Sequence, residues 1–416
     1  MAGRERTDVA IVGGGPAGAA LALRLARRGL DVLVLERASG WRWRAGGVFT
    51  SPAAMRELRG LGLGEELLRR IAQPIPAMRV ETPGGVSFRL TYGAERAGEG
   101  APGERAVGID RSTLDPALLA AAEAAGARIR PGTTFERADL QGARRAPVTV
   151  SARDEAGELV VEARVLAGAD GLRSAVARAL GVERRPRLPG RVGLTFHLPD
   201  AAGDSVRDAR MVVLPGAYCG IAPVPGGRVN VGIVLFGGAW RAQLGRTGPR
   251  ATAAAVLRSV PAAGPDGPGD GWRDGEVLDA IVGAAPLGSR VARRAGDGWL
   301  LLGDAAGFLD PFTGEGLHRA LVSARLAAKA IEACLEGRDR ASLRRYDVAM
   351  GARFAGKDVV SLLVQRFLEH PPLFEYAARR LATRQRVRAT MGLVMGDLVP
   401  ASRGLDPGFL ARLLAP

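Results

Sequence analysis

The chain has 416 residues, of which 47% are hydrophobic, and a formal net charge of +15. A chain of this length is too long to fold around one small hydrophobic core, which predicts two domains, or one domain with a large insertion. Only Lys329 and Lys357 among the 58 basic residues are lysines, and no run of five basic residues occurs. The charge therefore reflects an arginine bias, and we predict no nucleic-acid partner.

The sequence shows no cysteine motif, and we recognise no targeting or membrane-spanning segment in it. Cys219 and Cys334 lie far apart and form no CxxC motif, which indicates neither a disulfide framework nor a zinc site. No apolar run approaches the ~20 residues of a membrane-spanning helix, and the N-terminus carries no secretory pattern. We therefore predict a cytoplasmic protein without a bound metal.

The first motif fills residues 8–36. An apolar strand (8–12) runs into Gly13-Gly14-Gly15-Pro16-Ala17-Gly18, a helix follows (19–28), and a second strand (31–35) ends at Glu36. Gly13 allows the tight turn, Gly15 lets a pyrophosphate approach the backbone, and Gly18 lets the helix pack closely. The helix N-terminus favours phosphate, and Glu36 is placed to accept both ribose hydroxyls. The motif predicts a dinucleotide site without distinguishing FAD from NAD.

A loop rich in glycine and aromatic residues follows Glu36. Because it leaves the ribose-binding strand, it can lie across the far end of the cofactor, and Arg37, Arg44, Gly46 and Gly47 are candidate contacts. An ordinary surface loop remains the alternative. Strands are expected within 77–92, and Arg111 stands at the entrance of a helix reaching about residue 125, where its guanidinium could reach a phosphate or ring oxygen.

The middle and end of the chain contain a β-rich segment between stretches of α/β character. Further strands lead to Asp170-Gly171, and residues 185–290 predict an inserted antiparallel β domain with a helix near 251–260. A buried strand (299–302) then runs into Gly303-Asp304, which places the Asp304 carboxylate as a ligand-binding group of an open α/β sheet. A turn-rich loop, an amphipathic helix (317–335) and a helical tail complete the chain.

These motifs, in this order, resemble the FAD-dependent monooxygenase and geranylgeranyl reductase superfamily, which shares the fold of p-hydroxybenzoate hydroxylase. The resemblance spans about residues 7–335. It implies an α/β fold with a Rossmann-like FAD-binding domain (1–72, 105–184 and 290–335). A β-rich substrate domain (73–104 and 185–289) and a C-terminal helical region (336–416) complete the implied architecture.

The resemblance also implies the FAD contacts, residue by residue. They are Gly13, Gly15, Pro16, Ala17, Gly18, Glu36, Arg111, Asp170, Gly171, Gly303, Asp304, Pro311, Thr313, Gly314, Glu315, Gly316 and Leu317. Asp304 is expected to bind the ribityl chain. Asp170-Gly171 is expected to serve both FAD and a transient donor, NADPH or NADH.

The chain departs from the geranylgeranyl reductases at two places. Ala45 replaces the cysteine of their Cys-Gly-Gly motif. In the stretch from Tyr218 to Val224, the Tyr and Pro of their Tyr-x-Trp-x-Phe-Pro-Lys motif remain, while Gly220, Ala222 and Val224 replace Trp, Phe and Lys. The departures weigh against prenyl reduction, and the absence of any lysine before position 329 weighs against a halogenase.

We therefore expect an FAD-dependent oxidoreductase. The leading hypothesis is an NAD(P)H-dependent monooxygenase that uses O2, through a flavin C4a-hydroperoxide, to hydroxylate or epoxidise a hydrophobic or aromatic small molecule. The alternatives are a geranylgeranyl reductase-like reductase of isoprenoid double bonds and a non-catalytic FAD-binding protein. The chain is expected to be a monomer or homodimer.

Two side chains are candidates for chemistry. His318 could act as a base because His titrates near neutral pH, although a packing or flavin-orienting role is the stronger alternative. Tyr218 could orient a substrate or be an ordinary core tyrosine. The amphipathic tail from Pro371 could rest on an anionic membrane, but covering a cavity or forming a dimer is favoured.

Overall fold

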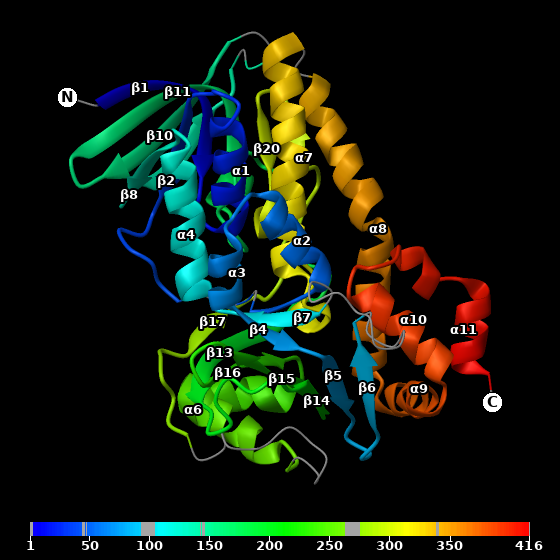
Figure 1. Cartoon of the computed structure of the whole chain (residues 1–416). Coiled ribbons are helices and arrows are strands. Elements are labelled where there is room, and N and C mark those ends of the chain that lie inside the picture. Colours follow the sequence, from blue (N-terminus) through cyan, green and yellow to red (C-terminus); the bar gives the residue numbers. More distant parts are fainter. Residues whose placement is uncertain are drawn as a thin grey trace.

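A computed structural model of the chain describes residues 3–43, 46, 48–92, 105–141, 143, 146–262, 275–337 and 341–415. It has two large sheets (Figure 1). A mainly parallel sheet with its helices lies at one end, a seven-stranded sheet lies at the other, and the C-terminal helices run along one side of both. The predicted α/β architecture is confirmed.

The parallel sheet is built around β1 (Gly3–Val12). This strand pairs in parallel with β2 (Val32–Glu36) on one side and with β11 (Gly157–Gly168) on the other. β8 (Arg128–Pro131) and β20 (Trp299–Leu301) extend it in parallel. The carboxyl ends of β1, β2, β11 and β20 therefore meet at one edge, where ligands bind in open α/β sheets.

Helices and a strand layer cover the two faces of this sheet. Alternate residues of β1 point to opposite sides: Val9 and Ile11 pack with α1 (Pro16–Ala26) and α7 (Gly316–Gly337), whereas Ala10 and Val12 pack with β9 and β10. The remaining elements of this end are α2 (Pro52–Gly60), α3 (Glu65–Ile71), α4 (Arg111–Ala124), β9 (Thr134–Asp139), β10 (Val148–Asp154), α5 (Ala175–Ala179), β12 (Glu183–Arg184), β18 (Arg290–Val291), β19 (Ala295–Gly296), η1 (Gly303–Ala306) and η2 (Pro311–Thr313).

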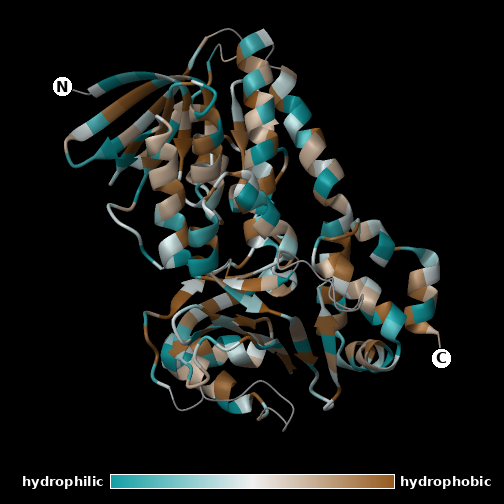
Figure 2. Cartoon of the chain, viewed as in Figure 1, coloured by the Kyte–Doolittle hydropathy of each residue, from teal (hydrophilic) through white to brown (hydrophobic). Residues whose placement is uncertain are grey.

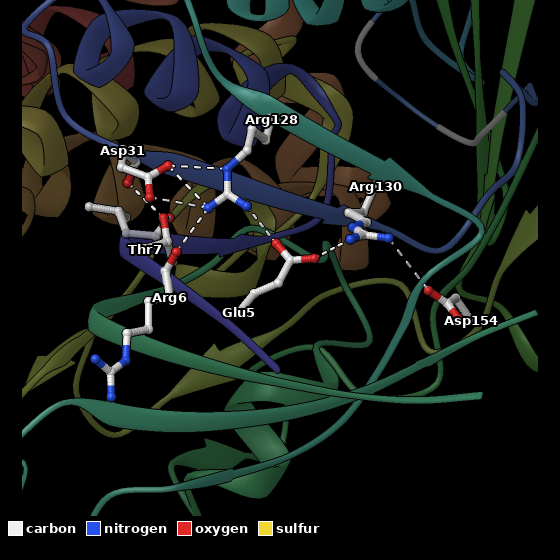
Figure 3. A network of polar contacts seen from close by, with 8 residues as sticks. Glu5, Arg6, Thr7, Asp31, Arg128, Arg130 and Asp154 are labelled. Atoms are coloured by element: carbon white, nitrogen blue, oxygen red, sulfur yellow. Dashed lines mark hydrogen bonds and ion pairs between the residues drawn. The ribbon is translucent and has the colours of Figure 1, made fainter. Parts of the chain in front are cut away.

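An ion-pair network lies at the opposite edge of the parallel sheet (Figure 3). Glu5 contacts Arg128 at 2.5 Å and also Arg130, and Arg128 contacts Asp31 at 3.1 Å. The two arginine side chains are 43% and 46% exposed. The Glu5 side chain is 14% exposed, but pairs whose arginine remains in water contribute little stability, because water already solvates the guanidinium.

We accordingly expect Glu5→Gln to lower the free energy of unfolding by less than about 1 kcal/mol. Urea denaturation measures the change, and Glu162→Gln, which removes the single exposed pair with Arg6, is the matched control. A loss above about 2 kcal/mol for Glu5→Gln alone would mean that the network acts cooperatively and is not a set of weak pairs.

The seven-stranded sheet has the order β17-β13-β16-β15-β14-β5-β6. Its strands are β5 (Ala77–Glu81), β6 (Ser87–Thr91), β13 (Val192–Pro199), β14 (Ala209–Leu214), β15 (Ala217–Val224), β16 (Arg228–Leu235) and β17 (Val282–Ala284). All neighbours are antiparallel except β5 and β14, which are parallel. The sequence predicted an antiparallel sheet throughout. No hairpin joins β5 to β14, so turn geometry does not impose an antiparallel pairing there.

The two faces of the seven-stranded sheet have different neighbours. Phe196 of β13 and Cys219 of β15 pack with α6 (Gly238–Ser259), whereas Tyr218 and Ala222 belong to the cluster on the other face. α6 is longer than the helix expected at 251–260, because two helices join at Gly248, whose φ is +76°. The face carrying Tyr218 is the one that meets the rest of the molecule.

A small sheet and the C-terminal helices complete the fold. β7 (Ala106–Ile109) pairs with β3 (Phe49–Thr50) and β4 (Ala72–Ile75) at the junction between the large sheets. β4 crosses the domain boundary predicted at 72/73, and the domain limits stay predictions. The C-terminal elements are α8 (Ala341–Glu369), α9 (Pro371–Thr383), α10 (Gln385–Met395), η3 (Ala401–Gly404) and α11 (Pro407–Leu414).

Hydrophobic residues are frequent in the strands, and the helices mix hydrophobic and hydrophilic residues along their length (Figure 2). Leu381 of α9 and Val394 of α10 join the same cluster as Leu90 of β6, which anchors the C-terminal helices to the seven-stranded sheet. Among the described residues, no helix has the length and apolar character needed to cross a bilayer.

Candidate flavin site

The glycines of the turn after β1 have two different roles: Gly13 and Gly18 allow close packing of the backbone, whereas Gly15 faces the space for a ligand. Gly13 has φ +102°, and a Cβ there would lie 2.5 Å from the Ala169 carbonyl oxygen; a Cβ on Gly18 would lie 1.9 Å from the Gly13 carbonyl oxygen. A Cβ on Gly15, by contrast, would meet no atom within 4 Å. Gly15 therefore faces open space at the N-terminus of α1, where Pro16 and Ala17 begin the helix and a pyrophosphate fits.

Glu36 ends β2 beside this turn and is 8% exposed. Its carboxylate accepts the Gly14 N–H at 2.7 Å and the Ala38 N–H at 2.9 Å. These bonds hold the side chain at the place where ribose hydroxyls would meet it. Arg37 follows as an exposed residue.

The Asp-Gly and Gly-Asp motifs converge on the same turn. The Cα of Asp170 lies 3.0 Å from a Cβ built on Gly13, and a Cβ on Gly303 would lie 2.8 Å from that of Ala17. The Asp170 carboxylate accepts the Ser174 hydroxyl at 2.6 Å and the Val176 N–H at 3.1 Å. It thus fixes the turn through Gly171 ahead of α5.

Arg111 binds groups of the protein itself. Its guanidinium forms a bidentate pair with Asp115, at 2.6 and 2.7 Å, and donates to the Gly46 carbonyl oxygen at 3.0 Å. The contact brings the loop after β2 to the start of α4, so Arg111 anchors that loop in addition to any contact with a cofactor. Arg44 and Gly47 lie outside the described residues.

Asp304 lies in η1, directly after β20, and is half-buried. Burial raises the pKa of Asp304 to about 6, against the lowering effect of Arg111 and Arg319. A carboxylate in this position gains from a hydroxyl donor, and the ribityl chain of a flavin offers such donors.

The raised pKa of Asp304 predicts a pH-dependent cofactor affinity. As pH falls through about 6, the carboxylate is protonated and loses acceptor strength, so we expect FAD to bind more weakly at pH 5 than at pH 7.5. Asp304→Asn should weaken FAD binding about 10- to 100-fold at pH 7.5 and flatten the pH dependence. Fluorescence titration measures both effects.

The contribution of Asp304 to the stability of the apoprotein should decrease as pH rises, which is opposite to its effect on FAD binding. Because the folded-state pKa of Asp304 lies above its usual value of 3.8, ionisation costs stability as pH rises from about 4 to about 6. Asp304→Asn should therefore leave the apoprotein at least as stable at neutral pH. Asp297→Asn, at a carboxylate that pairs with the exposed Arg344, is the control; equal pH profiles for both variants would contradict the assignment.

The segment from Pro311 to Leu317 forms the entrance of α7. Gly314 adopts a left-handed conformation (φ 65°), and a Cβ there would lie 2.5 Å from the Phe49 ring. Thr313, Glu315 and Leu317 are buried. Gly316 is the first residue of α7, whose N-terminal dipole favours an anion near this entrance.

The Glu315 side chain contacts both α7 and α8. Its Oε1 lies 3.5 Å from Arg319 and accepts the Ser361 hydroxyl of α8 at 3.4 Å. The carboxylate thus links the entrance of α7 to α8.

His318 is buried within the helical region. Its Nδ1 lies 3.0 Å from a carboxylate oxygen of Asp397, whose other oxygen lies 3.1 Å from Nζ of Lys357. Burial raises the pKa of Asp397, but Lys357 and His318 together hold it well below its usual range. The ring also packs edge-on against Phe354. These contacts suit a packing role, and the catalytic role of His318 stays a prediction.

Tyr218 belongs to a buried polar network centred on Asp310. The Tyr218 hydroxyl and the Gln365 amide donate to one Asp310 oxygen, at 2.5 and 2.7 Å, and Arg191 reaches the other at 3.2 Å. Arg191 also donates to Glu369 at 3.0 Å. Burial raises the pKa of Tyr218 far above its usual value, so its proton stays on the phenol.

This network joins three parts of the chain: the seven-stranded sheet through Tyr218, the loop before α7 through Asp310, and α8 through Gln365. Sequence reasoning identified Tyr218 and missed Asp310, Arg191 and Gln365. No local signal marks them, because the hydrogen-bonded pairs are separated by 55 to 174 positions.

A second cluster and a cavity lie apart from these groups. Nδ1 of His197 lies 2.6 Å from Asp279, and the Trp43 ring packs on the imidazole at 4.5 Å. A cavity of about 350 Å³ lies between α6 and the sheet, beside Phe196 and Leu257. It is on the face opposite Tyr218. Within the described ranges, no group of three His, Cys, Asp or Glu side chains is arranged to hold a metal.

The open space at Gly15, the fixed carboxylate of Glu36 and the half-buried Asp304 fit FAD, and the two-sheet fold is that of a Rossmann-type flavoprotein oxidoreductase. The chain belongs to the FAD binding domain family, which matches residues 6–355. The superfamily suggested by the motifs is therefore confirmed, and the protein is an FAD-dependent oxidoreductase.

Comparison with known proteins identifies relatives that are named as reductases and a structural neighbour that is named as a flavoprotein/dehydrogenase. The chain is 31% identical over 356 residues to menaquinone reductase of Mycobacterium tuberculosis, covering 82% of this chain and 79% of that protein. It is 31% identical over 352 residues to digeranylgeranylglycerophospholipid reductase 2 of Methanopyrus kandleri, covering 82% and 81%. The structure of a flavoprotein/dehydrogenase from Cytophaga hutchinsonii matches with a TM-score of 0.79 at 18% identity, covering 96% and 95%.

Proposed function

We propose that the protein is an FAD-dependent reductase that saturates a carbon–carbon double bond of a hydrophobic, isoprenoid-type substrate, with NADPH or NADH as the transient electron donor. The observation that carries the proposal is the 31% identity, over 82% of the chain, to two proteins named as reductases. One is named for menaquinone and the other for a digeranylgeranyl lipid. The proposal reverses the order of the two hypotheses drawn from the sequence, where monooxygenation led.

Different residues of the chain would have different roles in such a reaction. FAD, when bound, supplies the hydride equivalent. The N-terminus of α1 at Gly15 would hold the pyrophosphate, Glu36 the ribose and Asp304 the ribityl chain. The N-terminal dipole of α7 favours negative charge near the flavin ring. No step requires a metal ligand from the protein.

Saturating a double bond needs a proton as well as a hydride. Tyr218 is our candidate donor, because its hydroxyl keeps its proton and shares it with the buried Asp310 at 2.5 Å. Loss of that proton to a substrate carbon would leave a phenolate against the Asp310 carboxylate, with Arg191, 3.2 Å from Asp310, as the nearby positive charge. The positive guanidinium would offset part of the charge of this phenolate–carboxylate pair until water reprotonates the phenolate.

Monooxygenation remains the second candidate, and a specific observation favours it. Gly220 and Ala222 stand in β15 where geranylgeranyl reductases carry the rings of Trp and Phe, so the sheet face that carries Tyr218 and Ala222 lacks these two bulky side chains. A sheet face reshaped in this way suits a different hydrophobic or aromatic substrate, and O2 would then be the second substrate.

One experiment separates the candidates. Holoprotein is incubated with NADPH and either menaquinone or a geranylgeranyl lipid, once under argon and once under ¹⁸O₂, and the products are analysed by mass spectrometry. We expect a product that has gained two hydrogens under argon. Product formed only with oxygen, and carrying the label, would identify a monooxygenase. NADPH that is never oxidised with any substrate would favour a non-catalytic FAD-binding protein.

A further inference from the structure

The long helix α8 has one apolar face that points away from the molecule. Val348, Ala352, Ala355, Val359 and Leu363 follow one another at spacings of four, three, four and four residues, which keeps them on one side of a helix. Val348 is 73% exposed, Val359 51% and Leu363 37%, and both alanines are exposed. We call these five residues the outer stripe. At 1.5 Å per residue it is about 22 Å long.

The outer stripe is part of a wider bias in where apolar side chains are exposed. Eight large hydrophobic residues are exposed among the described residues. Five of them lie between positions 341 and 415: Val348, Val359, Leu363, Leu373 and Leu414. α8 runs along the outer side of the molecule beside α7 (Figure 1). Contiguous exposed apolar surface of this kind marks an interaction site.

The charges at the two ends of the outer stripe indicate whether a second copy of the chain or an anionic surface would bind there. Arg344 lies one turn before Val348 and Arg366 one turn after Leu363, and their side chains are 57% and 61% exposed although each contacts a carboxylate. In an antiparallel pair of two copies centred on Ala355, Arg344 of one copy would face Arg366 of the other. Like charges would then repel, whereas an anionic surface attracts both ends.

We propose that the outer stripe of α8 docks on an anionic phospholipid surface. Val348, Val359 and Leu363 enter the boundary between headgroups and acyl chains, and Arg344 and Arg366 meet lipid phosphates. Amphipathic helices bind membranes through this combination of apolar area and basic flanks. The docking surface stands on its own observations and does not depend on which flavin reaction the protein performs.

The inner side of the same helix reaches the candidate site. Gln365 donates to Asp310 at 2.7 Å, and the Ser361 hydroxyl donates to Glu315 at 3.4 Å. The outer stripe and the entrance of α7 are therefore separated by one helix, about 10 Å in diameter. A protein docked through this stripe would hold its redox site close to the lipid from which an apolar substrate is drawn.

The test uses flavin-loaded full-length protein and sedimentation with vesicles of equal parts phosphatidylcholine and phosphatidylglycerol. We expect the protein to bind, salt to weaken binding, and pure phosphatidylcholine vesicles to bind less. Val348→Asp with Val359→Asp should lower the vesicle affinity at least about tenfold. Val206→Asp, at a residue that is 54% exposed outside the C-terminal helices, should bind like the unaltered protein.

Further readouts make the test decisive. Flavin content and melting temperature of the double variant confirm that it is folded, and its turnover of a detergent-dispersed substrate should be unchanged, which separates docking from the reaction. Unaltered vesicle binding by the double variant, or no binding by the unaltered protein, would overturn the proposal. A dimer that the double variant loses, seen by light scattering without vesicle binding, would assign the stripe to self-association instead.

Discussion

Gly15→Val should give a folded protein that no longer binds FAD. A Cβ on Gly15 meets no protein atom within 4 Å, so the branched side chain disturbs only the space reserved for the pyrophosphate. The backbone there is extended (φ −68°, ψ −178°), which valine adopts readily. Replacing the N-cap glycine costs the apoprotein about 1 kcal/mol at most, whereas FAD affinity should fall at least about 100-fold.

Absorbance of the flavin bands and fluorescence titration measure the loss, and thermal unfolding of the apoprotein checks the fold. The contrasting variant is Gly18→Val in the same turn. Its Cβ would lie 1.9 Å from the Gly13 carbonyl oxygen, so we expect a loss of stability of more than about 3 kcal/mol. If Gly15→Val retained yellow colour and full affinity, the pyrophosphate could not lie at this turn.

Asp310→Ala should cause the largest loss of stability of any single carboxylate removal considered for this protein. Arg191 and Asp310 are 2% and 1% exposed and lie 3.2 Å apart. Removing Asp310 leaves the buried Arg191 with only the partly exposed Glu369 as counterion, and removing one member of a buried ion pair typically costs about 3–5 kcal/mol. The Tyr218 hydroxyl and the Gln365 amide lose their shared acceptor as well.

Chemical denaturation of the apoprotein measures this loss, and Asp297→Ala is the matched control, because it removes a carboxylate whose partner Arg344 is 57% exposed. The control should cost less than about 1 kcal/mol. The absorbance spectrum of bound flavin should also change in Asp310→Ala, since Asp310 begins the loop into α7. Equal losses for the two variants would mean that Glu369 alone compensates the charge of Arg191 when Asp310 is absent.

Buried contacts to α8 give the C-terminal helices a part in the candidate site. Gln365 and Ser361 of α8 reach Asp310 and Glu315, and Lys357 and Asp397 fix the surroundings of His318. The resemblance to known flavoproteins ended near residue 335, so none of these contacts was expected. Truncating the helical tail should therefore disturb the flavin site as well as the surface.

Several features could be predicted from the sequence because they depend on neighbours in the chain. The spacing of Gly13, Gly15 and Gly18 determines a turn, and the helix expected at 111–125 is found at Arg111–Ala124. The placement of Glu36 beside the turn also followed, because one strand and one helix of known rise connect them. Local backbone geometry is encoded in short-range patterns of glycine, apolar and capping residues.

Partners at long range were decided only by the tertiary structure. Tyr218 was recognised, but its acceptor lies 92 positions away, and Asp397 meets His318 from a segment that no motif marked. The parallel pairing of β5 with β14 likewise has no signal in either strand. Such contacts form because burying a charge or an unpaired strand edge without a partner costs several kcal/mol. Which residue or strand becomes the partner of a buried charge or strand edge depends on how all the elements pack together.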